Sequence, residues 1–159
     1  MPDLPNDVQT RVLQRIDREE LVRFAQKIVQ IPSVYGHEET LALFLAKKLK
    51  EWEFEVTVDE VLPRRPNVYG VMRGTTKGPT LMYNGHIDVV PPGEGWTDDP
   101  YSGILREGRL YGKGAADMKG PLAGIITAVK ALVDSGIKLR GDLLISAVVD
   151  EEYESIGTE

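Results

Sequence analysis

Cysteine is absent from this chain of 159 residues. A disulfide framework, a thiolate metal site and a cysteine nucleophile are therefore excluded. Long apolar segments are lacking too, because no run approaches the ~20 residues of a membrane-spanning helix. The opening residues, MPDLPNDVQTRVLQRID, contain no apolar stretch typical of a secretory signal peptide. We therefore expect a cytoplasmic protein without a membrane partner.

A strongly basic region is missing as well. The chain has 19 Lys and Arg residues against 25 Asp and Glu residues, a net charge of −6. Residues 1–80 carry 12 of each sign, so the whole acidic excess lies in residues 81–159. Proteins that bind nucleic acids or anionic membranes need a basic surface, and both classes are disfavoured. Acidic groups gathered in one half of the chain suit a cation site, and they equally suit solubility alone.

Apolar residues at helical spacing predict three helices. The first runs from about residue 7 or 17 to residue 30, and the second covers about residues 37–52. The third and clearest covers about residues 118–136. A hydrophobic content of 42% is enough for these helices to share one core.

Strand patterns alternate with the helices. Residues 54–58 alternate between apolar and polar types, and residues 67–73 and 80–83 indicate further strands. Residues 105–111 indicate a short hairpin, and LLISAVV at 143–149 is typical of a strand buried on both faces. This order predicts an α/β fold with a mixed, mostly buried sheet. In such sheets the functional side chains gather beyond the carboxyl ends of the strands.

The first polar cluster, His86 and Asp88, follows the strand expected at residues 80–83. Residues i and i+2 of an extended chain point the same way, so the two side chains can lie side by side. A neutral imidazole is a good ligand for zinc-like metals, and a carboxylate on its other nitrogen fixes the tautomer. The alternative is a hydrogen-bonded loop histidine beside a turn aspartate.

The second cluster is the glycine-rich segment from Gly112 to Gly120, with Asp117 where the third helix is expected to start. Asp117 is either a helix N-cap or a metal ligand, and the ligand interpretation needs other donors to converge on it. Phosphate binding at this helix start is a further alternative. The segment lacks the spacing of a Walker loop, however.

The third cluster is Asp150, Glu151 and Glu152, at the end of the apolar LLISAVV strand. Adjacent carboxylates in an extended chain point to different sides, so one can hold a metal while the other serves as a general base toward water. The alternative is a solvated acidic loop. Taken together, one imidazole and several carboxylates suit zinc, cobalt or manganese.

The segments that carry these clusters resemble the M20 family of metallopeptidases and deacylases. They are NGHIDVVPPGEGWTDDPYSG, GRLYGKGAADMKGPLAG and VVDEE, in this order. The family includes acetylornithine deacetylase, succinyl-diaminopimelate desuccinylase, glutamate carboxypeptidase and aminoacylase. Lys113 is a departure, because many members have arginine there. The resemblance implies a three-layer αβα zinc-peptidase-like fold.

The resemblance also implies roles for five residues. His86 and Glu152 would each bind one of two zinc ions, with Co²⁺ or Mn²⁺ as possible substitutes, and Asp117 would bridge the pair. Asp88 would orient His86, and Glu151 would be the general base toward a water between the metals. Members typically have a cis peptide bond after the bridging aspartate, so we expect one between Asp117 and Met118.

Domain organisation follows from the same resemblance. Residues 1–16 would be an N-terminal extension, and residues 17–159 would be the N-terminal part of a catalytic domain. Family members carry a further acidic ligand, a late histidine ligand and a lid domain that dimerises, all downstream. We therefore expect a truncated site that is inactive alone, in a protein that forms homodimers through its lid. The other histidine, His37, is expected to be a surface or helix-start residue.

The function implied is hydrolysis of an amide bond in N-acyl amino acids or small peptides. The segment WTDDPYSG favours the deacetylase and desuccinylase branch, and dipeptidase or aminopeptidase specificity stays open. A domain that kept the fold without the chemistry is a competing hypothesis.

Overall fold

The computed structural model describes residues 6–159, so the first five residues of the expected N-terminal extension lie outside it. The elements are, in order, α1 (Asn6–Leu13), α2 (Arg18–Val29), α3 (Glu39–Glu51), β1 (Glu55–Leu62), β2 (Arg65–Met72), β3 (Leu81–His86), β4 (Ile104–Arg106), β5 (Arg109–Tyr111), α4 (Lys119–Asp134), β6 (Leu143–Val148) and a short 3₁₀ helix, η1 (Ile156–Thr158).

The first predicted helix is divided into α1 and α2. Asp17 separates them, and its side chain accepts hydrogen bonds from the backbone N–H groups of Glu19 and Glu20. This carboxylate satisfies donors that the first turn of α2 leaves unpaired. α1 packs on α4, where the Arg11 guanidinium donates to the carbonyl oxygen of Ser135 at 2.9 Å.

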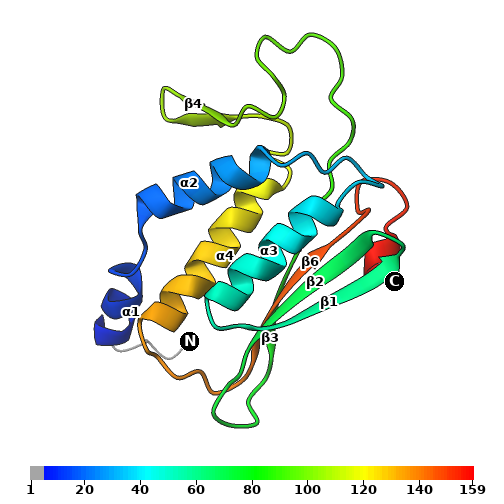
Figure 1. The fold of residues 1–159 in the computed structure, drawn as a ribbon. Coiled ribbons are helices and arrows are strands. Elements are labelled where there is room, and N and C mark those ends of the chain that lie inside the picture. Colours follow the sequence, from blue (N-terminus) through cyan, green and yellow to red (C-terminus); the bar gives the residue numbers. More distant parts are fainter. Residues whose placement is uncertain (1–5) are drawn as a thin grey trace.

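The core lies between the helices and the sheet. α3 contributes Leu41, Leu45 and Leu49, which are fully buried and recur every four residues. This spacing places them on one helical stripe, as the sequence predicts. α3 packs on β1 and β2, α4 packs on β3, and α2 packs on α4. In Figure 1 these helices lie on the same side of the sheet.

The four-stranded sheet has the order β1-β2-β6-β3. β1 pairs with β2 and β2 pairs with β6 in antiparallel fashion, whereas β3 runs parallel to β6. The apolar strand β6 is therefore a central strand, which explains its burial. The predicted α/β fold with a mixed sheet is confirmed.

Exposure of the sheet differs from the expectation in one respect. Leu81, Met82 and Tyr83 of β3 are exposed, because β3 is an edge strand and the described helices cover one face. The second helical layer of the expected three-layer arrangement is not among residues 6–159. None of the helices in this range is long and apolar enough to cross a bilayer.

Parallel pairing of β3 and β6 positions the polar clusters. Because the two strands run in the same direction, their carboxyl ends lie at one edge of the sheet. His86 is paired with Val148 in this register, so the residues after β6 lie close to His86. Two segments separated by more than 60 residues therefore meet at one place.

Candidate metal centre

His86 is the last residue of β3, and its side chain is only 4% exposed. Its Nδ1 atom lies 3.0 Å from the backbone carbonyl oxygen of Asp88 and 3.5 Å from the Asp88 carboxylate. A carbonyl oxygen can only accept, so Nδ1 is the donor and Nε2 is the ring atom left for other partners. The backbone N–H of His86 donates to the Met118 sulfur at 3.3 Å.

Asp117 lies in the glycine-rich segment between β5 and α4. The Asp117–Met118 peptide bond is cis, as expected. α4 begins at Lys119 with Met118 as its N-cap, so Asp117 does not cap the helix. Its side chain is 75% exposed, and its Oδ1 atom lies 3.1 Å from Nε2 of His86.

Glu151 and Glu152 lie in a turn that follows β6, not in an extended chain as the sequence suggested. Asp150 has a positive φ of 65°, which bends the chain immediately after the strand. Both glutamates consequently face the same region: Oε2 of Glu151 lies 3.7 Å from Nε2 of His86, and Glu152 offers a carboxylate oxygen to the same group.

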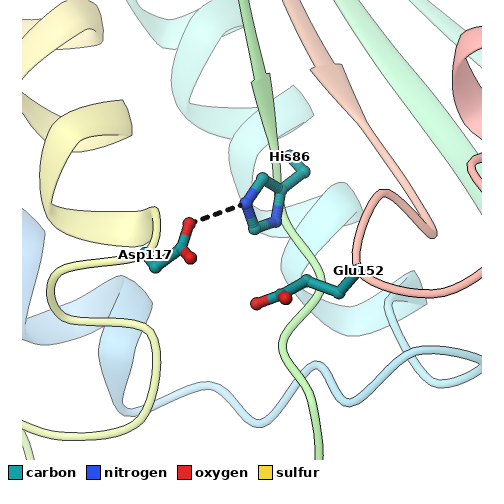
Figure 2. A group of neighbouring side chains, drawn as sticks. All are labelled: His86, Asp117 and Glu152. Carbon is teal, nitrogen blue, oxygen red and sulfur yellow. Dashed lines mark hydrogen bonds and ion pairs between the residues drawn. The ribbon is translucent and has the colours of Figure 1, made fainter.

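Three donors converge on one point. Each of His86, Asp117 and Glu152 offers one ligand atom, and these three atoms lie within 4.8 Å of one another. Figure 2 shows the three side chains pointing toward a common space. With a neutral ring, the lone pair of Nε2 faces an Asp117 oxygen at 3.1 Å. Two acceptors at this distance need a proton or a cation between them. An imidazole with two carboxylates fits a zinc-like divalent cation.

Electrostatics at the centre follow from burial and pairing. Burial lowers the pKa of His86, but the Asp88 and Asp117 carboxylates outweigh this effect and raise the pKa to about 9. Burial raises the pKa of Asp88, but His86 and the N–H groups of Glu152 and Glu151 hold this pKa below its ordinary value of 3.8. Asp88 is therefore a carboxylate, and positive charge is stabilised at His86.

Asp88 contacts more than His86. Its carboxylate is fully buried and accepts hydrogen bonds from the backbone N–H groups of Glu151 at 3.1 Å and Glu152 at 3.0 Å. One aspartate thus fixes the histidine and also the turn that carries both glutamates. The sequence indicated the first contact but not the second, because the second joins residues 63 and 64 positions apart.

A surface cleft of about 340 Å³ opens beside the centre. Asp117 and Glu152 line it together with Val90, Trp96 and the segment from Gly112 to Ala116. Lys113 is the cationic side chain in this lining. The cleft therefore combines acidic metal-ligand candidates, an aromatic ring and one amine.

Comparison with known proteins places this centre in a family. Residues 82–159, which include all three clusters, match peptidase family M20/M25/M40. The chain belongs to this family. A deformylase of N-formyl-4-amino-5-aminomethyl-2-methylpyrimidine from Bacillus subtilis is 36% identical over 148 residues, which cover 89% of this chain and 35% of the relative. Succinyl-diaminopimelate desuccinylase from Gluconacetobacter diazotrophicus is 39% identical over 132 residues, covering 80% and 34% respectively.

Solved M20-type structures share the fold. Human carnosine dipeptidase 1 superimposes with a TM-score of 0.85 at 25% identity, covering 98% of this chain and 37% of the dipeptidase. This chain thus spans about a third of the length of the relatives that it matches.

The structure also shows where polar residues outside the three donors lie. Lys119 is fully buried and its Nζ atom donates to the Ile31 carbonyl at 2.7 Å, so this amine is not available to a phosphate. His37 is on the surface, as expected. Sequence reasoning missed Arg65, whose guanidinium contacts Glu38 and Asp150. No local pattern marks this contact, since Arg65 and Asp150 are 85 positions apart.

Proposed function

We propose that the protein hydrolyses an amide bond in N-acyl amino acids or small peptides in a metal-dependent reaction. The observation that carries the proposal is the convergence of His86, Asp117 and Glu152 from three separate segments at the edge of an open cleft. Membership of the M20/M25/M40 family supports the same reaction class. A domain that kept the fold without chemistry has no need to keep these donors within 4.8 Å of one another.

His86, Asp117 and Glu152 would hold a pair of cations, with zinc as the first candidate and Co²⁺ or Mn²⁺ as alternatives. When bound, a divalent cation supplies Lewis acidity toward a carbonyl oxygen and toward water. In the two-ion arrangement of the proposal, His86 and Glu152 would each hold one ion and Asp117 would be shared by both. Its exposed carboxylate has two oxygens and is therefore suited to a bridging position.

Glu151 is the proposed general base. Its side chain is 51% exposed, so water reaches it, and its Oε2 atom lies 3.7 Å from Nε2 of His86. A carboxylate in this position can accept a proton from water and pass it to the departing amine. Asp88 holds His86 and the turn with Glu151 in a fixed relation and does not contact the substrate.

The described residues do not supply a complete ligand set for two ions. Zinc takes about four ligands, of which about three come from protein at catalytic sites. Three donors within residues 6–159 are too few for two such ions. We propose that further ligands come from residues outside this sequence, that a lid domain outside it forms the homodimer contact, and that residues 1–159 alone have little activity.

The cleft supports an anionic substrate. Lys113 lines it with Trp96 and Val90, so a substrate can combine an acyl chain with a carboxylate. N-acyl amino acids meet this description and agree with the succinyl-diaminopimelate desuccinylase relative. The deformylase relative shares only the N-acyl bond, because its named substrate is a pyrimidine. Dipeptides are the second candidate, favoured by the likeness to carnosine dipeptidase 1.

The proposal is tested with the longest available form of the protein. N-succinyl and N-formyl amino acids and dipeptides are assayed after Zn²⁺ or Co²⁺ is added, and Glu151→Ala is compared with Glu154→Gln. Glu154 is exposed in the same turn, and its side chain makes no hydrogen bond or ion pair with the described residues. We expect Glu151→Ala to bind Co²⁺ normally and lose turnover, and Glu154→Gln to retain both. Normal turnover by Glu151→Ala would remove its assignment as the base.

A further inference from the structure

The turn at residues 150–156 is held from within by Asp150. The Asp150 carboxylate accepts hydrogen bonds from the backbone N–H groups of Glu154 at 3.2 Å and Ile156 at 3.5 Å. The Asp150 carbonyl oxygen accepts from the N–H of Ser155 at 2.7 Å. Asp150 itself is fully buried. One buried residue therefore organises the backbone on the far side of Glu151 and Glu152.

Arg65, the first residue of β2, fixes Asp150 in turn. Its guanidinium forms ion pairs with both Asp150 and Glu38, and its Nε atom donates to Glu38 at 3.1 Å. The Arg65 side chain is 15% exposed, and the two carboxylates are 1% exposed or less. Burial of two carboxylates is costly unless a cation pairs with them. Among residues 6–159, Arg65 is the cation that pairs with both.

The turn is thus held between two buried carboxylates. Asp88 binds the N–H groups of Glu151 and Glu152, and Asp150 binds those of Glu154 and Ile156. His86 contacts the first carboxylate and Arg65 contacts the second. Displacement of Asp150 would therefore change where both glutamates point relative to His86.

We infer that Arg65 is a positioning residue for this site: through Asp150 it fixes the turn that presents Glu151 and Glu152. The catalytic consequence rests on the proposed function, whereas the effect on the turn does not. Glu38 shares the guanidinium but does not touch the turn, so its contribution to the site is the smaller one.

A matched control lies at the other end of the same strand. Arg73 follows β2 and also pairs with two carboxylates, Glu55 and Asp142, but it is 59% exposed and remote from the turn. Arg65→Met, Arg65→Lys and Arg73→Met are compared in the longest available form of the protein. The readouts are amide hydrogen exchange of Glu154 and Ile156 without metal, Co²⁺ affinity by absorption spectroscopy, and kcat and KM separately.

We expect Arg65→Met to raise exchange at both amides and to lower Co²⁺ affinity and kcat by about 10–100-fold, the usual effect of losing a residue that orients metal ligands. Arg65→Lys should show a smaller change than Arg65→Met in exchange, Co²⁺ affinity and kcat. The lysine ammonium keeps the positive charge but lacks the planar, bidentate geometry of the guanidinium. Arg73→Met should leave all three unchanged. Unaltered exchange and Co²⁺ affinity in folded Arg65→Met would overturn the inference.

If Arg65→Met does not fold, Asp150→Asn tests the same link. This change keeps the shape but places an amide donor where the turn and Arg65 require acceptors, so exchange should rise and Co²⁺ affinity should fall. Unchanged values in Asp150→Asn would also overturn the inference. Failure of the wild-type protein to bind Co²⁺ would overturn the proposed function, and the exchange measurement would still decide the role of Arg65.

Discussion

Nε2 of His86 lies 3.1 Å from Oδ1 of Asp117, although the residues are 31 positions apart in the chain. β3 presents the histidine and the segment before α4 presents the aspartate. Because Nδ1 of His86 is occupied by Asp88, Nε2 is the atom that meets Asp117 and, at 3.7 Å, Glu151. The parallel pairing of β3 with β6 then adds Glu152 to the same space.

Loss of Asp117 should abolish tight cation binding. The free energy of zinc binding at four-ligand sites is about 10–16 kcal/mol. One ligand therefore accounts for about 3 kcal/mol, which corresponds to roughly 100-fold in affinity. Isothermal titration with Zn²⁺ should show a loss of at least this size in Asp117→Asn. Asp98→Asn, a change at the Arg106 ion pair, is the control. Equal affinity in Asp117→Asn and wild type would exclude Asp117 as a ligand.

Cation binding should stabilise the fold through His86. A ligand that binds only the native state at 100 times its Kd adds about 2.7 kcal/mol to the free energy of unfolding. Urea unfolding with and without Zn²⁺ should show this gain in the wild type and a much smaller one in His86→Ala. His37→Ala, at an exposed histidine, should behave like the wild type. An equal gain in His86→Ala would place the binding elsewhere.

Asn67 should be essential for anchoring the residues on both sides of the turn. Its side chain accepts from the buried Val149 N–H at 3.0 Å and donates to the Gly157 carbonyl at 2.8 Å. Asn67→Ala leaves both backbone groups unpaired, and each buried unpaired group costs about 1–3 kcal/mol. We expect a loss of about 2–5 kcal/mol in urea unfolding. Asn84→Ala, on the exposed part of β3, should change stability by less than about 0.5 kcal/mol.

Asp142 should give stability that is lost in acid. The Gly74 N–H and the Arg73 guanidinium bind its carboxylate and lower its pKa below the ordinary value of 3.8. A lowered pKa means that the stabilisation is present above pH 3.8 and disappears as pH falls through the lower native value. The difference in unfolding free energy between wild type and Asp142→Asn should therefore shrink below pH 3.8. If the difference in unfolding free energy stayed constant below pH 3.8, the stabilising role of the Asp142 carboxylate would be refuted.

Local patterns in the sequence were sufficient for most elements. The leucine stripe of α3 has a helical period that predicts the helix and its buried face. The continuous apolar run of β6 predicts a buried strand. The position of β6 between β2 and β3 was not predictable in this way. Strand order depends on pairings between distant segments, and periodicity within one segment does not report them.

For the candidate site too, local motifs were predictable from the sequence and long-range contacts were not. His86, Asp117 and Glu152 could be named from clusters at element ends and from the family resemblance, and the structure brings them together. The cis bond at Asp117–Met118 followed from the resemblance alone. The bent turn at Asp150 was missed, because its positive φ depends on contacts with Arg65 and with the N–H groups of the turn.

The central claim is that His86, Asp117 and Glu152 together form one metal centre, and anomalous diffraction tests it most directly. Crystals of the protein grown with Zn²⁺ are measured on both sides of the zinc absorption edge. We expect two zinc peaks, one about 2.0–2.2 Å from Nε2 of His86 and a carboxylate oxygen of Asp117, and the other about 2.0–2.2 Å from carboxylate oxygens of Asp117 and Glu152. A zinc peak bound elsewhere, with no density between these three side chains, would contradict it.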